Sequence, residues 1–173
     1  MNPPEAKISS EERAELMRLL HDSESAFLNT IEGLTLAEWE WKSAPGDWSI
    51  AETAEHLVLG EAAMLAKIEQ ALASAPDPEW QTQSERKAKF LGRVLPDRST
   101  KATAPAVIAP CGGWTTGETV ARYKEGRART LCLVEQIEAA VKAHWSRHPM
   151  PVFDMLSVYH WLLYIPLHNE RHN

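Results

Sequence analysis

Two histidines near the end of the 173-residue sequence, His168 and His172, have the spacing of a metal-binding pair. Residues four apart stand one turn apart on the same face of an α-helix, so both imidazoles can reach one ion. Neutral imidazole is the commonest metal ligand in proteins. A second pair with this spacing, His144 and His148, runs directly into Pro149 and is interpreted as a helix end at the surface. The first pair is therefore the stronger candidate for a metal site.

A catalytic metal site needs a third protein ligand and an open position for water or substrate. His56 lies in the middle of a long helical segment, roughly 120° from the centre of its apolar stripe at about 100° per residue. Periodicity alone does not place it in the core, but small neighbours such as Gly60 leave space for a pocket. His160 is predicted to be a hydrogen-bonded core residue, and His21 a surface residue. His56 is therefore the best-placed third histidine.

Four segments with helical periodicity must position these residues. Capping boxes of the form Ser-x-x-Glu begin the first segment at Ser9 and the second at Ser49. The last segment is apolar on nearly every face, which is typical of a helix buried in the middle of a bundle. No alternating strand pattern competes with these segments. We predict long helices over residues 9–31, 49–72, 115–141 and 152–172, and a short turn of helix over 35–41.

The stretch of residues 75–114 separates the second long helix from the third. It contains five prolines and a basic cluster at residues 86–89, without a sustained period. An irregular connection of roughly forty residues is far longer than a usual loop, which favours a packed or functional crossover over a flexible tether. We therefore predict an all-α four-helix bundle in a single domain, residues 1–173, with one long crossover between helices two and three.

Composition excludes several classes of function. Lys and Arg number 18 against 24 Asp and Glu, a net charge of −6, and no long basic run is present, which argues against a nucleic-acid binder. No segment reaches the roughly 20 apolar residues of a membrane helix, and the first residues lack the apolar core of a signal peptide. Cys111 and Cys132 have no CxxC spacing, so neither a disulfide framework nor a cysteine zinc site is indicated. We expect a cytoplasmic protein that binds a small-molecule substrate, without nucleic-acid or membrane partners.

Two groups of motifs resemble the DinB-like superfamily. The family's second-helix signature is similar to Gly46-Asp47-Trp48-Ser49-Ile50-Ala51-Glu52, followed by Glu55-His56-Leu57. Its last helix is similar to His148-Pro149, Tyr159-His160-Trp161 and His168-Asn169-Glu170-Arg171-His172. The resemblance covers nearly the whole chain and implies a four-helix bundle with a divalent metal held by three histidines. Carried over position by position, these ligands are His56, His168 and His172.

The family includes thiol-dependent S-transferases that use bacillithiol, mycothiol or glutathione, and dimers are common among its members. The resemblance therefore implies a homodimeric metal-dependent S-transferase, with Zn or Ni as the metal and a low-molecular-weight thiol as co-substrate. Three neutral imidazoles leave the charge of the metal uncompensated, so a bound thiol would be strongly acidified. A thiolate at neutral pH is a ready nucleophile for an electrophilic substrate.

Alternatives to thiol transfer remain open. Water activated by the metal would hydrolyse an amide or ester, although the sequence offers no clear general base; a non-catalytic bundle would use the histidines for a structural metal or a ligand pocket. Arg171 and Arg127 are candidates to hold a carboxylate of the thiol or substrate, or else pair with Asp or Glu. Glu52 is a candidate either to orient His56 or to cap its helix. No residue is assigned as catalytic.

Overall fold

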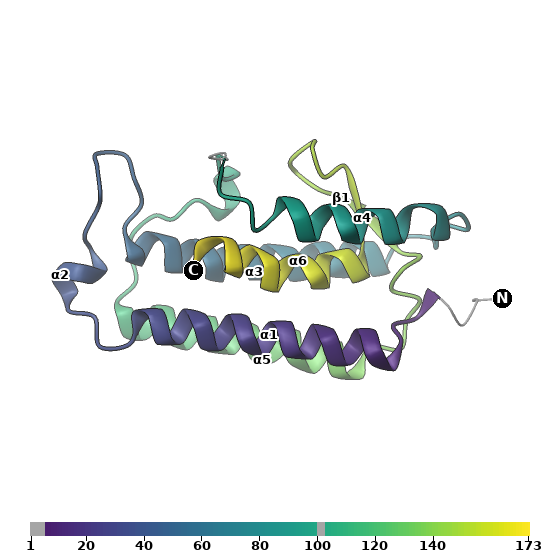
Figure 1. The fold of residues 1–173 in the computed structure, drawn as a ribbon, viewed down its shortest axis with the longest axis horizontal. Helices are drawn as coiled ribbons and strands as arrows, with labels where there is room; N and C mark the ends of the chain where they lie inside the picture. Colours follow the sequence, from purple (N-terminus) through teal and green to yellow (C-terminus); the bar gives the residue numbers. More distant parts are fainter. Residues whose placement is uncertain (1–5, 100–102) are drawn as a thin grey trace.

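The computed structural model describes residues 6–99 and 103–173. In chain order its elements are α1 (Ser10–Ile31), α2 (Leu36–Trp39), α3 (Ile50–Leu72), α4 (Gln81–Val94), the 3-10 helix η2 (Ala106–Ile108), α5 (Thr116–Gln136), β1 (Trp145–Arg147), β2 (Met155–Ser157) and α6 (Val158–His172). The helices α1, α3, α5 and α6 form a four-helix bundle (Figure 1). The predicted all-α bundle is confirmed.

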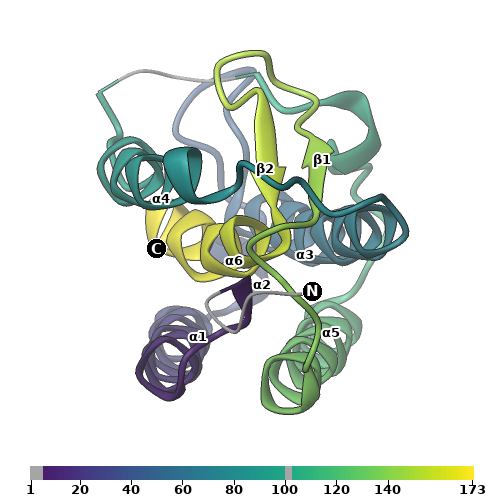
Figure 2. The same cartoon turned by 90° about the vertical axis from the view of Figure 1, so that its right-hand side faces the viewer.

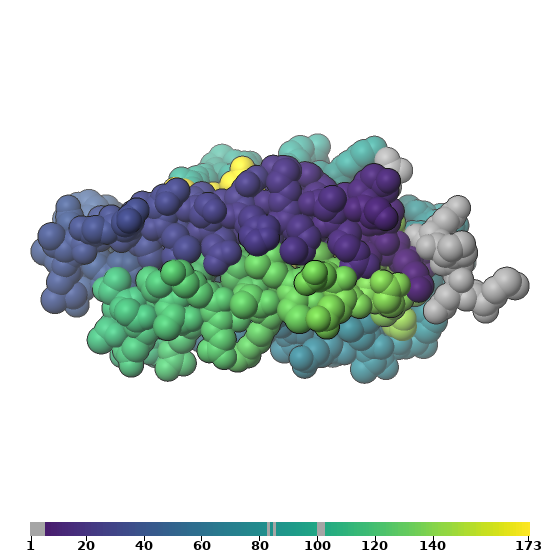
Figure 3. All heavy atoms as spheres, turned by 90° about the horizontal axis from the view of Figure 1, so that it is seen from below, coloured from purple at the N-terminus to yellow at the C-terminus, as the bar shows by residue number. Residues whose placement is uncertain are grey.

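The bundle is arranged in layers, with α3 and α6 between the other helices (Figure 2). On one side α1 and α5 lie next to each other and cover that face along its length (Figure 3). On the other side α4 packs against α6. The helices α3 and α5 run in the same direction (Figure 1), so the chain must return along the bundle between them. The long crossover, which includes α4, makes this return.

Capping boxes begin all but one of the α-helices in the described residues. In each box a hydroxyl accepts the N–H of the third helical residue, whose side chain accepts the N–H of the capping residue. The capping residues are Ser9, Thr35, Ser49, Thr115 and Ser157. The exception is α4, which follows Trp80 and has no side-chain cap.

The crossover is more regular than the sequence predicts, because α4 is a helix of 14 residues. It buries Leu91 in the core that it shares with α6, while Arg86 and Arg93 are exposed. The start of this helix has no capping box, so the sequence lacks the signal that marks the start of the other helices. The prediction of an irregular connection is wrong for these residues.

The segment between α5 and α6 also differs from the prediction, because it contains two short strands. Trp145 pairs with Ser157 in the antiparallel ladder of β1 and β2. The last helix begins at Val158 and not at residue 152, because Ser157 is its cap. The preceding helix ends at Gln136, although Val141 is fully buried and continues its apolar pattern along a non-helical backbone. Three-residue strands are too short to produce a recognisable alternation.

The core explains why α6 is apolar on every face. Ten of its fifteen residues are buried, among them Trp161 and Ile165. A second apolar cluster lies near α2, where Phe27, Trp39 and Tyr123 meet. None of the described helices is long and apolar enough to span a membrane. Because α6 is buried on most of its surface, its histidine pair is held in the middle of the bundle.

Candidate metal centre

His56 is buried on the second turn of α3, with 3% of its surface exposed. Its Nδ1 lies 2.8 Å from the carbonyl oxygen of Ile108 in η2. A carbonyl only accepts, so Nδ1 carries the hydrogen and Nε2 keeps its lone pair. That lone pair faces His168 of α6, Nε2 to Nε2, at 3.1 Å. The crossover therefore sets the tautomer that a metal ligand requires.

The histidine cluster consists of His56, His168 and His172. The ring centroids lie 5.0 Å apart for the first two, 4.9 Å for the first and third, and 4.8 Å for the last two. One nitrogen from each ring lies within 4.8 Å of the others. Ligands at roughly 2.0–2.1 Å from one ion lie about 3 Å from each other. The three residues that the sequence predicts as ligands are thus brought together.

Gly60, one turn after His56 on α3, leaves space for the ring of His168. A Cβ at position 60 would lie 3.3 Å from Cε1 of His168, tighter than most side-chain contacts. The imidazole thus occupies the volume that a side chain on α3 would fill. This close approach brings α6 near enough for its ligands to meet the one on α3.

Burial keeps the three rings neutral. It lowers the pKa of His56, lowers the pKa of His172 to about 4, and takes the pKa of His168 well below its usual value. Mutual repulsion between the ring charges acts in the same direction for His168 and His172. Neutral imidazole is the form that binds a metal. The donor set therefore fits a divalent ion, with three nitrogen ligands and no carboxylate in the cluster found among the described residues.

Comparison with known proteins identifies the family and the fold of this chain. A sequence model of the DinB superfamily matches residues 19–173. The chain belongs to this superfamily. It is 24% identical over 161 residues to the uncharacterized protein YuaE of Bacillus subtilis (strain 168), a match that covers 90% of this chain and 91% of YuaE. The structure of YfiT from Bacillus subtilis, described as a probable metal-dependent hydrolase with an unusual four-helix bundle topology, matches with a TM-score of 0.61 and 16% identity, over 95% of this chain and 83% of YfiT.

In this DinB-superfamily chain the second half of the crossover is fastened to α3 beside the cluster. The carboxylate of Glu55 accepts hydrogen bonds from the N–H and Sγ of Cys111, both at 3.1 Å, and from the N–H of Gly112 at 2.9 Å. Burial opposes ionisation of Glu55, but these donors outweigh it and its pKa is lowered. No role was predicted for Glu55 from the sequence, although it precedes His56 within the second-helix motif. The loop that supplies the carbonyl of Ile108 is therefore held in place.

Trp48 and Tyr164 flank the cluster. The Trp48 ring lies 4.9 Å from that of His56, and the Tyr164 ring 5.8 Å from that of His168. Tyr164 is buried, whereas 37% of Trp48 is exposed. The third histidine, His172, is the last residue of α6 and is half-buried. The cluster thus has aromatic rings beside two of its histidines, and its third histidine is partly exposed.

The two candidate arginines of the DinB-superfamily chain make other contacts. Arg171 donates hydrogen bonds to the carbonyls of Leu95 and Asp97, which tie the end of α6 to the segment after α4. Arg127 has no exposed surface and forms an ion pair with Glu61 at 3.0 Å. The structure therefore gives Arg127 the alternative role considered for it, a pair with an acidic residue, and a fully buried guanidinium does not contact a solute.

Glu52 caps α3, because its carboxylate accepts the N–H of Ser49 at 2.8 Å and pairs with Lys42 at 2.7 Å. This is the second of its two candidate roles.

His148 corrects a prediction, because it is buried. Only 7% of it is exposed, and its ring stacks on Trp161 at 5.0 Å and on Tyr164 at 5.2 Å. It follows β1 and is not at a frayed helix end, so the surface placement is wrong. His144 is half-buried and bonds to the carbonyl of Ser74.

The two remaining histidines follow the prediction. His160 is fully buried, with Nε2 bonded to the carbonyl of Ser84, as expected of a core residue. His21 is exposed, as expected.

Proposed function

We propose that this chain is a divalent-metal-dependent S-transferase that joins a low-molecular-weight thiol to a small electrophile. The observation that carries the proposal is the buried cluster of three neutral imidazoles, His56, His168 and His172. A divalent ion bound there, Zn or Ni by preference, would act as a Lewis acid that lowers the pKa of a thiol reaching its open position. The resemblance to thiol-using members of the superfamily supports this choice of nucleophile.

The chain's own groups support the reaction by orientation and desolvation. The carbonyl of Ile108 holds Nδ1 of His56 protonated, so its Nε2 faces the ion site. Trp48 and Tyr164 place apolar ring surface beside His56 and His168. In the transfer a sulfur–carbon bond forms, the bond from carbon to the leaving group breaks with its electron pair, and the thiol proton passes to solvent. A thiol has a pKa near 8.5, so this step does not need the strong general base that water requires.

A second candidate function is hydrolysis of a small amide or ester at the same cluster. The description of YfiT, which shares the fold, as a probable metal-dependent hydrolase favours it. The carboxylate next to the cluster in sequence, Glu55, is occupied by the crossover backbone, so it does not supply a base. Thiol transfer therefore remains the first proposal.

The proposal extends to the partners of the chain. The acidic net charge of −6 supports a small-molecule substrate over nucleic acid. The common occurrence of dimers in the superfamily supports a homodimer, and two free cysteines, Cys111 and Cys132, support the reducing cytoplasm. Light scattering on the untagged protein measures its oligomeric state. A mass near 19.4 kDa, that of one chain, contradicts the dimer.

The test begins with metal analysis of protein purified without a histidine tag. We expect about one equivalent of divalent metal, which His168→Ala removes and His21→Ala, at an exposed histidine outside the cluster, retains. Depletion of bacillithiol, mycothiol, glutathione or coenzyme A against monochlorobimane then measures transfer. Transfer that persists in His168→Ala contradicts the mechanism. Ester hydrolysis without any thiol selects the second candidate.

A further inference from the structure

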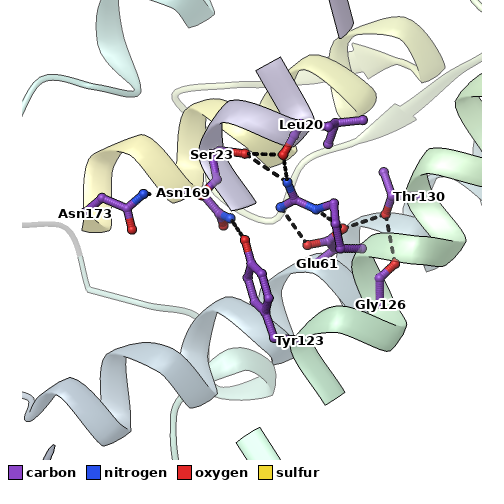
Figure 4. Close-up of polar contacts among 9 residues, drawn as sticks. Leu20, Ser23, Glu61, Tyr123, Gly126, Thr130, Asn169 and Asn173 are labelled. Carbon is purple, nitrogen blue, oxygen red and sulfur yellow. Dashed lines mark hydrogen bonds and ion pairs between the residues drawn. The ribbon is translucent and has the colours of Figure 1, made fainter. Parts of the chain in front are cut away.

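A buried polar network that does not include the three histidines joins α1, α3, α5 and α6 (Figure 4). At its middle the guanidinium of Arg127 in α5 bonds both carboxylate oxygens of Glu61 in α3, at 3.1 and 3.0 Å. It also donates to Ser23 Oγ at 2.9 Å and to the carbonyl of Leu20 at 2.6 Å, both in α1. These four hydrogen bonds satisfy a fully buried charge, so α5 is fixed relative to α3 and α1.

Tyr123, one turn before Arg127, extends this network to α6. Its ring lies 4.3 Å from Phe27 and 5.4 Å from the guanidinium of Arg127. Burial raises the pKa of Tyr123, so the hydroxyl keeps its proton. The hydroxyl oxygen accepts a hydrogen bond from the side-chain amide of Asn169, of which 2% is exposed. Asn169 is therefore linked through α5 to α3, the helix that carries His56.

Asn169 lies between His168 and His172 in sequence, but on a different face of α6. At about 100° per residue, its side chain points roughly 60–100° away from the two ligands. The ligands face α3, whereas the amide faces α5. A hydrogen bond at this angle resists rotation of the helix about its own axis.

Rotation matters here because Pro166 interrupts α6 just before the ligands. Proline has no N–H, so the carbonyl of Leu162 loses its helical partner and the last turns are less firmly joined to the first. A side-chain atom on a helix lies roughly 6 Å from the axis, so a rotation of about 10° moves it by about 1 Å. Metal–ligand distances tolerate only about 0.2 Å. Packing of apolar side chains alone does not fix an angle this closely.

We propose that Asn169 and Tyr123 are positioning residues, whose hydrogen bond sets the rotation of the end of α6 so that His168 and His172 meet His56. The inference rests on the proposed metal centre but concerns residues that are not ligands. The two ligand-bearing helices are thereby held in register through α5, by way of Arg127 and Glu61.

The test compares Tyr123→Phe and Asn169→Leu with the wild-type chain for binding of Zn²⁺ alone. Tyr123→Phe keeps the ring against Phe27 and removes only the hydroxyl, so the fold is retained. The full-length protein is stripped of metal, and its dissociation constant is measured by competition with a colorimetric chelator. We expect each variant to bind about tenfold more weakly, as for other residues that orient metal ligands. The double variant is expected to lose no more Zn²⁺ affinity than either single variant, because both substitutions remove the same hydrogen bond.

Ser146→Ala is the matched control. Ser146 Oγ accepts a buried hydrogen bond from Nε1 of Trp161, at 2.9 Å, which also holds α6 but on the other side of Pro166. A general loss of helix packing would weaken Zn²⁺ binding in this variant too, whereas the proposal predicts a dissociation constant within twofold of wild type. The proposal is overturned if the dissociation constants of Tyr123→Phe and Asn169→Leu also stay within twofold of wild type. It is also overturned if Ser146→Ala binds Zn²⁺ as weakly as these two variants.

A metal-free measurement separates this inference from the proposed function. Nuclear Overhauser contacts between the rings of His56 and His168 report their juxtaposition in the stripped protein. We expect strong contacts in wild type and Ser146→Ala and clearly weaker ones in Tyr123→Phe and Asn169→Leu, because the intensity falls steeply with distance. If wild type binds no Zn²⁺, the proposed function fails, and the ring contacts still decide whether the hydrogen bond positions α6. Ring contacts of wild-type intensity in both Tyr123→Phe and Asn169→Leu overturn the inference.

Discussion

The histidines of this chain differ in role because of what lies beside each ring nitrogen. A carbonyl at Nδ1 of His56 leaves Nε2 free toward the cluster. In His160 both nitrogens are used inside the protein: Nδ1 accepts the N–H of Ser157, so Nε2 donates to the carbonyl of Ser84. A ring with a free, buried lone pair beside two others has the arrangement that a metal ligand needs, whereas one with both nitrogens paired is a core residue.

A substitution at Gly60 tests whether the close approach of His168 to α3 is needed for metal binding. In Gly60→Ala the new Cβ meets Cε1 of His168 at 3.3 Å, so the ring or α6 must shift by a few tenths of an ångström. That shift is comparable to the tolerance of a metal–ligand bond, and we expect Zn²⁺ affinity to fall about tenfold. Chelator competition on the stripped protein measures it.

Gly126→Ala is the control for this change. Gly126 lies inside α5, and a Cβ there has no atom within 4 Å. Alanine is the better helix former, so we expect this variant to gain about 0.5–1 kcal/mol in free energy of unfolding and to bind Zn²⁺ normally. Equal metal affinity in Gly60→Ala and Gly126→Ala would show that His168 does not depend on this close approach.

The position of a site residue could be predicted where a local sequence pattern indicates it. The spacing of His168 and His172 on an apolar helix is visible in the sequence, because helical periodicity is local. His56 was a candidate because of its central place in a helix with small neighbours, and the superfamily motif supported it, although its angle from the apolar stripe of α3 does not place it in the core. The contacts of Ile108 and Asn169 depend on pairing between distant segments, which no local pattern encodes. His148 was misplaced for the same reason, because its burial depends on a strand pair too short to recognise.

At the scale of elements, capping boxes account for most of what was predicted. The boxes at Ser9 and Ser49 mark helix starts in the sequence, and both helices begin at the following residue. The uncapped α4 was missed. The box of α6 uses a histidine at its third position, Ser157-x-x-His160, and so lacks the Glu or Gln that usually marks this motif. Its start was therefore predicted several residues too early.

This unusual box predicts a large effect for Ser157→Ala. Ser157 is fully buried, and its hydroxyl accepts the N–H of His160 and lies 2.7 Å from Nδ1 of the same residue. Its loss leaves a buried N–H without a partner in the first turn of the central helix. We expect a cost of about 2–3 kcal/mol in free energy of unfolding, measured by urea titration.

Ser9→Ala is the matched comparison, because Ser9 caps α1 in the same way but is exposed. Water can replace the hydrogen bond of an exposed cap, so we expect a loss of about 1 kcal/mol or less in free energy of unfolding. Equal costs for the two serines would mean that burial of the α6 box adds nothing to the stability of the fold.

For the whole molecule, the direction of the helices explains the crossover and the site together. Since α3 and α5 run the same way, the chain must return along the bundle, and this return carries both α4 and the loop that contacts His56. The length of the crossover was predicted from its sequence, but its helix and its contacts were not. A connection required by topology thus also supplies the carbonyl that orients a ligand.

The pH dependence of stability is a property of the whole fold, and buried histidines determine its sign. Burial lowers the pKa of both His148 and His160 to about 4, against 6.5 for an unperturbed ring. Between these values the unfolded chain binds more protons than the folded one, so stability is complete above about pH 6.5 and is lost as the pH falls toward 4. At pH 5 each of these two rings lowers the free energy of unfolding by about 2 kcal/mol relative to its value above pH 6.5.

His148→Phe isolates one of these contributions. The phenyl ring keeps the stacking on Trp161 and Tyr164 but does not titrate. The hydrogen bond from the N–H of Met150 is lost at every pH and adds only a constant offset. Urea unfolding of the stripped protein at pH 7.5 and pH 5 should therefore show a loss that is smaller in the variant than in wild type by about 2 kcal/mol. Parallel losses would mean that the ring of His148 is already accessible to protons in the folded protein, and that its stack on α6 opens without unfolding.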